Sequence, residues 1–265
     1  MKKKKYDFTY DDLKNSLIKT GLKKKDSIFL TTSLGNLGVP FTKNKNFILI
    51  ISRWLKKSIE EIIGKNGNIF VPTYSYTFSG KKKFFYTKKT KAKIGYFPNF
   101  FLKQKRVFRS HDPMMSIAGT GPNAKNILNN ISNSSFGKNS VFEKLLNIRN
   151  LKCCTIGLSY NWIPFLHYLD WRNDAPFRFD KIFEGYINNK RKKWIFFARH
   201  LRKETVSNGY KLGYAALKNK LYSKSIIGKS QIFVINYKEF FYFTKRLTKN
   251  NKWLTVNGPK FKTKN

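Results

Sequence analysis

The sequence predicts an α/β protein, a single mixed-sheet domain that spans residues 1–265 and is flanked by helices. Short β-rich runs such as SIFLTT (27–32) and LKCCTIGL (151–158) alternate with longer segments of helical spacing. This alternation is typical of one α/β sheet. No internal repeat or clear linker divides the chain, and 265 residues are enough to bury a large core. The core motifs fall within 27–185, and we expect residues 186–265 to complete the same domain.

Helix caps and apolar runs predict the elements of the first half of the chain. Thr9 and Asp12 form a near-capping box and Gly21 offers a C-terminal stop, so a helix is expected over roughly 10–20. Helical spacing followed by glycine predicts a second helix over 46–64. The other elements expected here are strands at 27–32 and 68–76, a helix interrupted near Pro98, and a third strand within 109–121.

The second half continues the alternation. Pro122 is placed at a helix start in PNAKNILNNI, and 139–148 has the pattern of an amphipathic helix. A buried strand at 151–158 is followed by a turn and a helix around FLHYLDW (165–171). Beyond residue 185 we expect strands in KKWIFFAR and SQIFVINY and a last helix in YKEFFYFTKRLTKN.

The charge balance is strongly basic, with 54 Lys and Arg against 14 Asp and Glu and a formal net charge of +40. An excess of this size is typical of proteins that bind nucleic acid or another polyanion. The lysines are spread along the whole chain, however, and not concentrated on one reading element. An equal alternative is therefore that the lysine excess reflects amino-acid composition alone and simply covers a solvated surface. Non-specific nucleic-acid binding stays open.

Cysteine usage and hydropathy indicate a cytoplasmic protein without a membrane span. Cys153 and Cys154 are adjacent in a predicted strand, so their side chains should point to opposite faces and cannot pair with each other. The basic N-terminus is followed by no apolar stretch, which is unlike a signal peptide, and no run reaches eighteen apolar residues. Three scattered histidines and two adjacent cysteines give no metal-ligand spacing, so no metal is expected.

Several motifs could carry chemistry, and each has a plainer reading. The loops SLGNLG (33–38) and GTGPNA (119–124) could present backbone N–H groups to phosphate, or they could be ordinary turns. Ser159 could be a hydrolase nucleophile with His200 as its base, but Asn161 stands where the second glycine of that motif belongs.

His167 and Asp170 stand three residues apart in a predicted helix, so they share one face. A carboxylate that orients an imidazole is the usual way to make a general base near neutral pH. The alternative is a histidine that is hydrogen-bonded within an aromatic core. The pair alone does not decide between them.

Six stretches in fixed order, taken together, resemble the aminoglycoside 3-N-acetyltransferase family. They are DSIFLTTSLGNLG, NIFVPTYSYTF, RSHDPMMSIAGTGP, SFGKNSVFEKL, TIGLSYNWIPFLHYLDW and NDAPFRFDK. The resemblance implies transfer of an acetyl group from acetyl-CoA directly to an amine. It implies that His167 is the general base, that Asp170 orients it, and that Thr32, Ser33, Leu34, Gly35, Arg109, Ser110 and Ser116 contact CoA, while Tyr74, Asp112 and Arg178 contact the acceptor.

The chain departs from the family pattern at four positions. Thr31 and Asp112 replace histidines, Pro164 replaces a threonine, and Asp170 replaces a glutamate. Because a +40 protein repels polycations, we expect the acceptor to be a neutral or anionic amino sugar, such as a surface-polysaccharide precursor, rather than an aminoglycoside. The alternative function is a non-catalytic or retuned member that binds a polyanion. The oligomeric state stays open.

Overall fold

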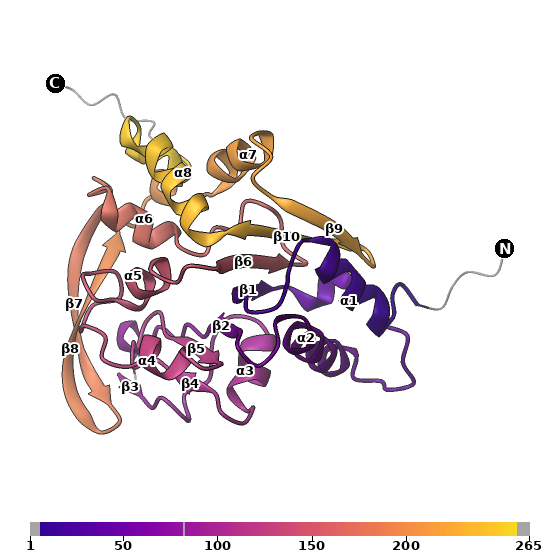
Figure 1. Cartoon of the computed structure of the whole chain (residues 1–265). Coiled ribbons are helices and arrows are strands. Elements are labelled where there is room, and N and C mark those ends of the chain that lie inside the picture. The colour runs from indigo at the N-terminus through magenta and orange to yellow at the C-terminus, as the bar shows by residue number, and fades with distance from the viewer. Residues whose placement is uncertain (1–5, 82, 259–265) are drawn as a thin grey trace.

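The computed structural model describes residues 6–81 and 83–258, and it contains a seven-stranded mixed sheet with the order β4-β5-β2-β1-β6-β10-β9 (Figure 1). Its strands are β1 (Ser27–Thr32), β2 (Asn68–Pro72), β4 (Phe108–Arg109), β5 (Ile117–Thr120), β6 (Leu151–Ile156), β9 (Ser223–Ile227) and β10 (Ser230–Asn236). The central strand β1 pairs in parallel with β2 and β6. The outer strands β5, β4, β10 and β9 all run antiparallel to their neighbours.

A second sheet has the order β3-β7-β8. It consists of β3 (Phe84–Phe85), β7 (Arg178–Ile187) and β8 (Lys190–Arg199). Figure 1 shows the long β7–β8 hairpin at one end of the molecule, away from the N-terminal helices. Asn188 and Asn189 make the turn, and both have positive φ, of 46° and 67°, as a two-residue hairpin loop requires.

The sheet has a core on each face. The helices are α1 (Tyr10–Lys19), α2 (Phe47–Ile63), α3 (Phe97–Leu102), α4 (Ala124–Leu128), α5 (Val141–Leu146), α6 (Leu166–Arg172), α7 (Tyr210–Lys218) and α8 (Tyr237–Lys249). Apolar residues of α1, α2 and α3 pack with Ile28 and Cys154 on one face. Residues of α4 to α8 pack with Phe29 and Cys153 on the other. The two neighbouring cysteines therefore point to opposite faces, as predicted, and both are buried and free.

Local signals explain why the predicted elements form. The Thr9 side chain accepts from Asp12 N and the Asp12 carboxylate accepts from Thr9 N, which completes the capping box that starts α1. Gly64, with φ of 68°, ends α2 by donating its N–H to Glu60 O. The helix that was expected to be interrupted near Pro98 instead begins there, because Pro98 lies in the first turn of α3, where a missing N–H costs nothing.

Among the described residues, four strands and α-helices were not predicted, namely β3, β7, α7 and β9, and β2 ends four residues earlier than expected, at Pro72. The third strand predicted within 109–121 is instead two short strands, β4 and β5, separated by a segment folded around Asp112. The α/β class with a mixed sheet flanked by helices is confirmed. Within the ranges that the structure describes, no helix is long and apolar enough to cross a membrane.

Candidate functional site

The loops after the three parallel strands meet at one edge of the sheet, where α/β proteins commonly bind ligands. Ser33 follows β1, Thr73 follows β2 and Gly157 follows β6. The Ser33 N–H donates to Ile156 O at 2.9 Å. Gly157 has φ of +70°, and a Cβ there would overlap the Ser33 carbonyl oxygen. Only glycine allows the β1 and β6 loops to approach this closely.

His167 lies in the first turn of α6 at this edge, and its side chain is 30% exposed. The Arg178 guanidinium, at the start of β7, reaches it: Nη2 lies 2.6 Å from His167 Nδ1. Arg178 Nε donates to Asp170 Oδ2 at 2.6 Å. His167 Nδ1 and Asp170 Oδ2 are 4.0 Å apart. Asp170 therefore contacts the imidazole through Arg178 rather than directly.

This arrangement fixes the resting protonation state of His167. Burial, with a further contribution from the Arg178 charge, holds the pKa of His167 below its ordinary value of 6.5 despite the opposing effect of Asp170. Because a guanidinium can only donate, Nδ1 must accept, and the neutral ring carries its proton on Nε2. Burial also lowers the pKa of Arg178. Asp170 is 1% exposed, and its Oδ1 has no hydrogen-bond partner among the residues that the structure describes.

His167 lines a cavity of about 190 Å³ at this edge. Its walls come from the segment after β2, the loop before α6 and the segment before α7, and they are mainly apolar and aromatic. The lining residues are Pro72, Tyr74, Tyr76, Ile94, Met115, Asn161, Trp162, Ile163, Pro164, Leu166, His167, Ser207 and Gly209. Of the lining residues, none is Asp or Glu. Tyr74 was predicted to contact the acceptor, and the structure places it in this wall.

Arg109 is the centre of a second buried network, behind that wall. Its Nε lies 3.1 Å from both Thr73 Oγ1 and Ser116 Oγ, and its Nη2 donates to Thr73 O at 2.7 Å. Nη1 donates to the carbonyls of Thr87 and Thr90, and the guanidinium lies 4.8 Å from the centre of the Phe85 ring. Burial lowers the pKa of Arg109 to about 10. These contacts tie the 86–94 segment to the sheet.

Three other predicted site residues bond within the protein. Ser110 Oγ accepts from Ile117 N, Ser116 Oγ donates to Thr73 O, and both residues are 0% exposed. The Asp112 carboxylate accepts from the N–H groups of Met114 and Met115 at 2.7 and 2.8 Å. Burial raises the pKa of Asp112 to about 6. Their hydrogen bonds shape the segment that carries Met115, which is a lining residue of the cavity.

The predicted CoA loop lies next to a different, open cavity of about 690 Å³. Gly35 lines it together with Lys45 and Asn46 at the N-terminus of α2, whereas Leu34 is buried in the core. The Asn46 side chain caps α2 by accepting from Leu49 N at 3.1 Å. The N-terminus of a 17-residue helix and a lysine thus line this cavity, and both favour an anion.

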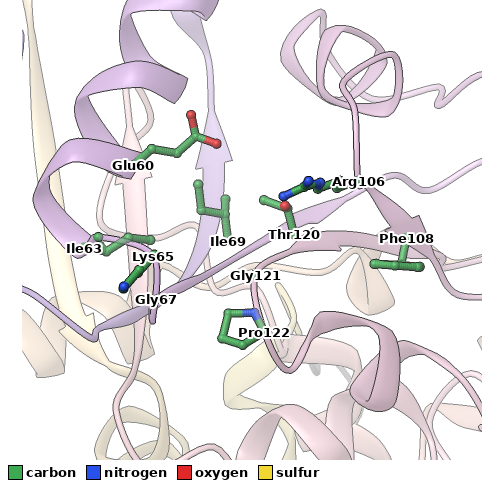
Figure 2. Close-up of a pocket in the computed structure, with 11 residues that line it drawn as sticks. Glu60, Ile63, Lys65, Gly67, Ile69, Arg106, Phe108, Thr120, Gly121 and Pro122 are labelled. Atoms are coloured by element: carbon green, nitrogen blue, oxygen red, sulfur yellow. The ribbon is translucent and has the colours of Figure 1, made fainter.

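Three further cavities hold none of the predicted site residues, and one of them, of about 360 Å³, lies along α8 and is lined by Asn173, Tyr242, Lys245, Arg246 and Lys249. Figure 2 shows a second, of about 520 Å³, at the opposite ends of the parallel strands, between Glu60, Lys65, Arg106 and the turn at Gly121. The third is lined by Phe177, Trp253 and His200, whose ring packs on Phe179 at 4.9 Å. Across residues 6–81 and 83–258, no three His, Cys, Asp or Glu side chains are grouped so as to hold a metal ion.

Residues 32–249 match the family model described as aminoglycoside 3-N-acetyltransferase. The chain belongs to this family. The resemblance noted in the sequence is thereby confirmed, and the chain is an acetyltransferase-family protein. No curated protein sequence matches it significantly.

Solved structures, among them those of aminoglycoside acetyltransferases, have the same fold. AAC-IIIb in a binary complex with CoASH is 15% identical, with a TM-score of 0.76 over 96% of this chain and 100% of that one. Sisomicin-bound AAC-VIa is 14% identical, with a TM-score of 0.77 over 91% and 98%. YokD from Bacillus subtilis is 18% identical, with a TM-score of 0.74 over 92% and 100%. At these identities the likeness concerns the fold alone.

Sequence reasoning missed several residues of the cavity wall. Tyr76 and Trp162 had no motif role, and Ser207 lies in a segment with no recognised pattern. Arg178 was assigned to the acceptor, but the structure places its side chain on His167 and Asp170. An Arg only eight residues after Asp170 was the one sequence signal that could have indicated the ion pair between Arg178 and Asp170.

Proposed function

We propose that this family member is an acetyl-CoA-dependent N-acetyltransferase that acetylates the amine of an amino sugar, with His167 as the general base. The observation that supports it best is a half-buried imidazole, kept neutral by burial and Arg178, in the wall of a cavity at the ligand-binding edge of the sheet. A neutral imidazole is the form that accepts a proton.

The reaction removes two protons from the acceptor nitrogen and exchanges one bond at the thioester carbonyl carbon. The acceptor ammonium loses a proton to His167, and the freed amine attacks the thioester carbonyl carbon. The new C–N bond forms as the C–S bond breaks; the nitrogen then loses its second proton to solvent, and His167 passes the first proton to the CoA thiolate. The products are the amide, the CoA thiol and one released proton.

For Nε2 to act as the base, the ring proton must move to Nδ1, which then needs an acceptor. Asp170 Oδ2, 4.0 Å away, is the carboxylate in position to take that hydrogen bond once Arg178 withdraws from Nδ1. In the catalytic conformation that we propose, Asp170 therefore orients His167 directly. Arg178 remains paired with the same carboxylate through Nε.

CoA would enter at the loop Thr32-Ser33-Leu34-Gly35. The open cavity beside Gly35, with Lys45 and the N-terminus of α2, offers the charge that CoA phosphates require. Arg109, Ser110 and Ser116 act in this proposal as positioning residues, because their polar groups hold the segments behind Tyr74. Asp112 holds Met115 in the cavity wall by accepting a hydrogen bond from its backbone N–H.

Release of CoA thiol from acetyl-CoA, in a screen over amino sugars, tests the activity. His167→Ala should abolish release while leaving thermal stabilisation by CoA intact, and retained turnover would remove His167 from the mechanism. Stabilisation by CoA that persists between roughly 0.05 and 0.5 M NaCl supports the enzyme. Binding to any polyanion that is lost over the same range, without turnover, supports the non-catalytic alternative.

A further inference from the structure

The wall of the His167 cavity is unusually aromatic for a site that must hold an amine. Tyr74 is 7% exposed and packs against Tyr76, with ring centroids 6.2 Å apart at 67°. Trp162, on the loop before α6, is 44% exposed. Ile94 and Met115 complete the apolar surface. Aromatic faces of this kind favour the apolar face of a ring over a charged group.

The wall offers no counter-charge for a second ammonium. Of the described residues that line the cavity, none is Asp or Glu. The two acids behind it are committed elsewhere: Asp112 accepts two backbone N–H groups and Asp170 pairs with Arg178. Both are at most 2% exposed. An additional ammonium would therefore be desolvated without a partner and repelled by Arg178.

The aromatic wall is held in place before any ligand binds. Tyr76 has a left-handed backbone, with φ of 50°. The N–H groups of Ser75 and Tyr76 both donate to Met114 O, at 3.2 and 3.3 Å. Non-glycine residues keep this conformation only where their surroundings impose it, and such positions cluster at ligand sites.

We infer that the acceptor carries a single amine on an otherwise uncharged ring, whose apolar face packs on Tyr74, Tyr76 and Trp162. The inference rests on the proposed acetyl transfer and narrows its substrate class. At about 190 Å³, the cavity is smaller than the roughly 300 Å³ at which drug-sized sites begin, so it suits one ring and not a multi-ring polyamine. The attacking nitrogen faces His167, and in a nucleotide-linked acceptor the anionic groups lie outside the cavity that holds the ring.

Steady-state CoA-thiol release with paired acceptors tests this. We expect kcat/KM for a monoamine sugar, free or nucleotide-linked, to exceed that for a polyamine aminoglycoside such as kanamycin by about tenfold or more. Faster turnover of kanamycin would overturn the inference and leave the proposed acetyl transfer standing. Thermal stabilisation by acetyl-CoA with no turnover of any monoamine would also overturn the inference. Absence of both CoA binding and turnover would instead overturn the proposed function.

Two variants distinguish the effect of the aromatic cavity wall on KM from that of an exposed aromatic residue elsewhere on the surface. Trp162→Ala should raise KM for the monoamine about tenfold with kcat little changed, because the contact is with the ring and not with the reacting atoms. Tyr242→Ala is the matched control, since Tyr242 on α8 is 43% exposed and lies outside this cavity. Equal KM for the two variants would contradict a packing role for Trp162.

A third variant, Ile94→Glu, adds a carboxylate to the cavity wall. It should improve kcat/KM for kanamycin relative to the monoamine, and an unchanged ratio would contradict the inference that the missing counter-charge excludes polyamines.

Discussion

Arg178 lies between His167 and Asp170, with Nη2 2.6 Å from the imidazole and Nε 2.6 Å from the carboxylate. The Arg178 guanidinium neutralises the buried Asp170 carboxylate. It also occupies His167 Nδ1, the nitrogen to which this carboxylate would otherwise hydrogen-bond. Stability and reactivity of the site therefore depend on one side chain. The two roles can be separated by experiment.

Arg178→Met should lower the free energy of unfolding by about 3–5 kcal/mol, because it leaves the Asp170 carboxylate buried and unpaired. Urea denaturation at neutral pH measures the change. The double variant Arg178→Met with Asp170→Leu should recover most of the loss, since no buried charge then remains. A double variant as unstable as the single one would show that the ion pair is not the cause.

The pH dependence of His167 follows from the direction of its pKa shift. Because the folded-state pKa lies below 6.5, the unfolded chain binds more protons in the window just below that value. The contribution of His167 to stability is therefore lost as pH falls below 6.5, and kcat/KM should be level above it. An NMR titration, with the His167 signal assigned by its loss in His167→Gln, measures the pKa. Arg178→Met should raise it, and an unchanged value would mean that burial alone sets it.

The titration of Asp112 should change stability with pH in the opposite direction to that of His167. Its pKa is raised from 3.8 to about 6, so the folded state binds the extra proton and stability falls as pH rises through that interval. Asp112→Asn keeps an oxygen for the N–H groups of Met114 and Met115 but does not titrate. From about pH 4 to pH 7 the variant should gain on the order of 3 kcal/mol in unfolding free energy relative to the parent chain. A pH-independent difference would contradict this.

The loops at the sheet edge offer a matched pair of glycines. Gly157→Ala should lower the free energy of unfolding by about 1–3 kcal/mol, because of its φ of +70° and the overlap with the Ser33 carbonyl. Gly35→Ala should leave stability nearly unchanged, since nothing lies within 4 Å of the added Cβ. Gly35→Val should raise KM for acetyl-CoA without affecting unfolding, because Gly35 lines the open cavity. Equal unfolding free energies for the two alanine variants would contradict the close approach of the loops.

The sequence was sufficient for elements whose local signals agree with their packing. SIFLTT and LKCCTIGL are apolar on both sides because both faces of the sheet are covered, and they form the predicted strands β1 and β6. β7 was missed because half of its residues are exposed and four of the ten are charged, so RFDKIFEGYI shows no clean alternation. Its Asn188-Asn189 turn was the usable signal.

Only those residues of the candidate site that belong to a recognisable motif could be predicted from the sequence. His167 and Tyr74 come from motifs in fixed order, and the structure places both in one cavity. The contact of Arg178 with His167 depends on how the hairpin returns over α6, which no spacing rule gives. The cavity wall likewise combines residues as far apart as Tyr74, Trp162 and Ser207, so it exists only in the folded chain.

Arg109 illustrates how a chain with 54 basic and 14 acidic residues stabilises a partly buried cation. Its hydrogen-bond partners among the described residues are hydroxyls and carbonyls, none of which titrates in the range where proteins work. The segment from Thr87 to Ile94, with lysines at 88, 89, 91 and 93, is thus anchored against its own repulsion by hydrogen bonds to Arg109 and not by a direct ion pair. Acidification that protonates Asp112 removes one stabilising charge near Arg109 but none of these hydrogen bonds, so Ile94 keeps its position in the cavity wall across the pH range in which the imidazole beside it changes charge.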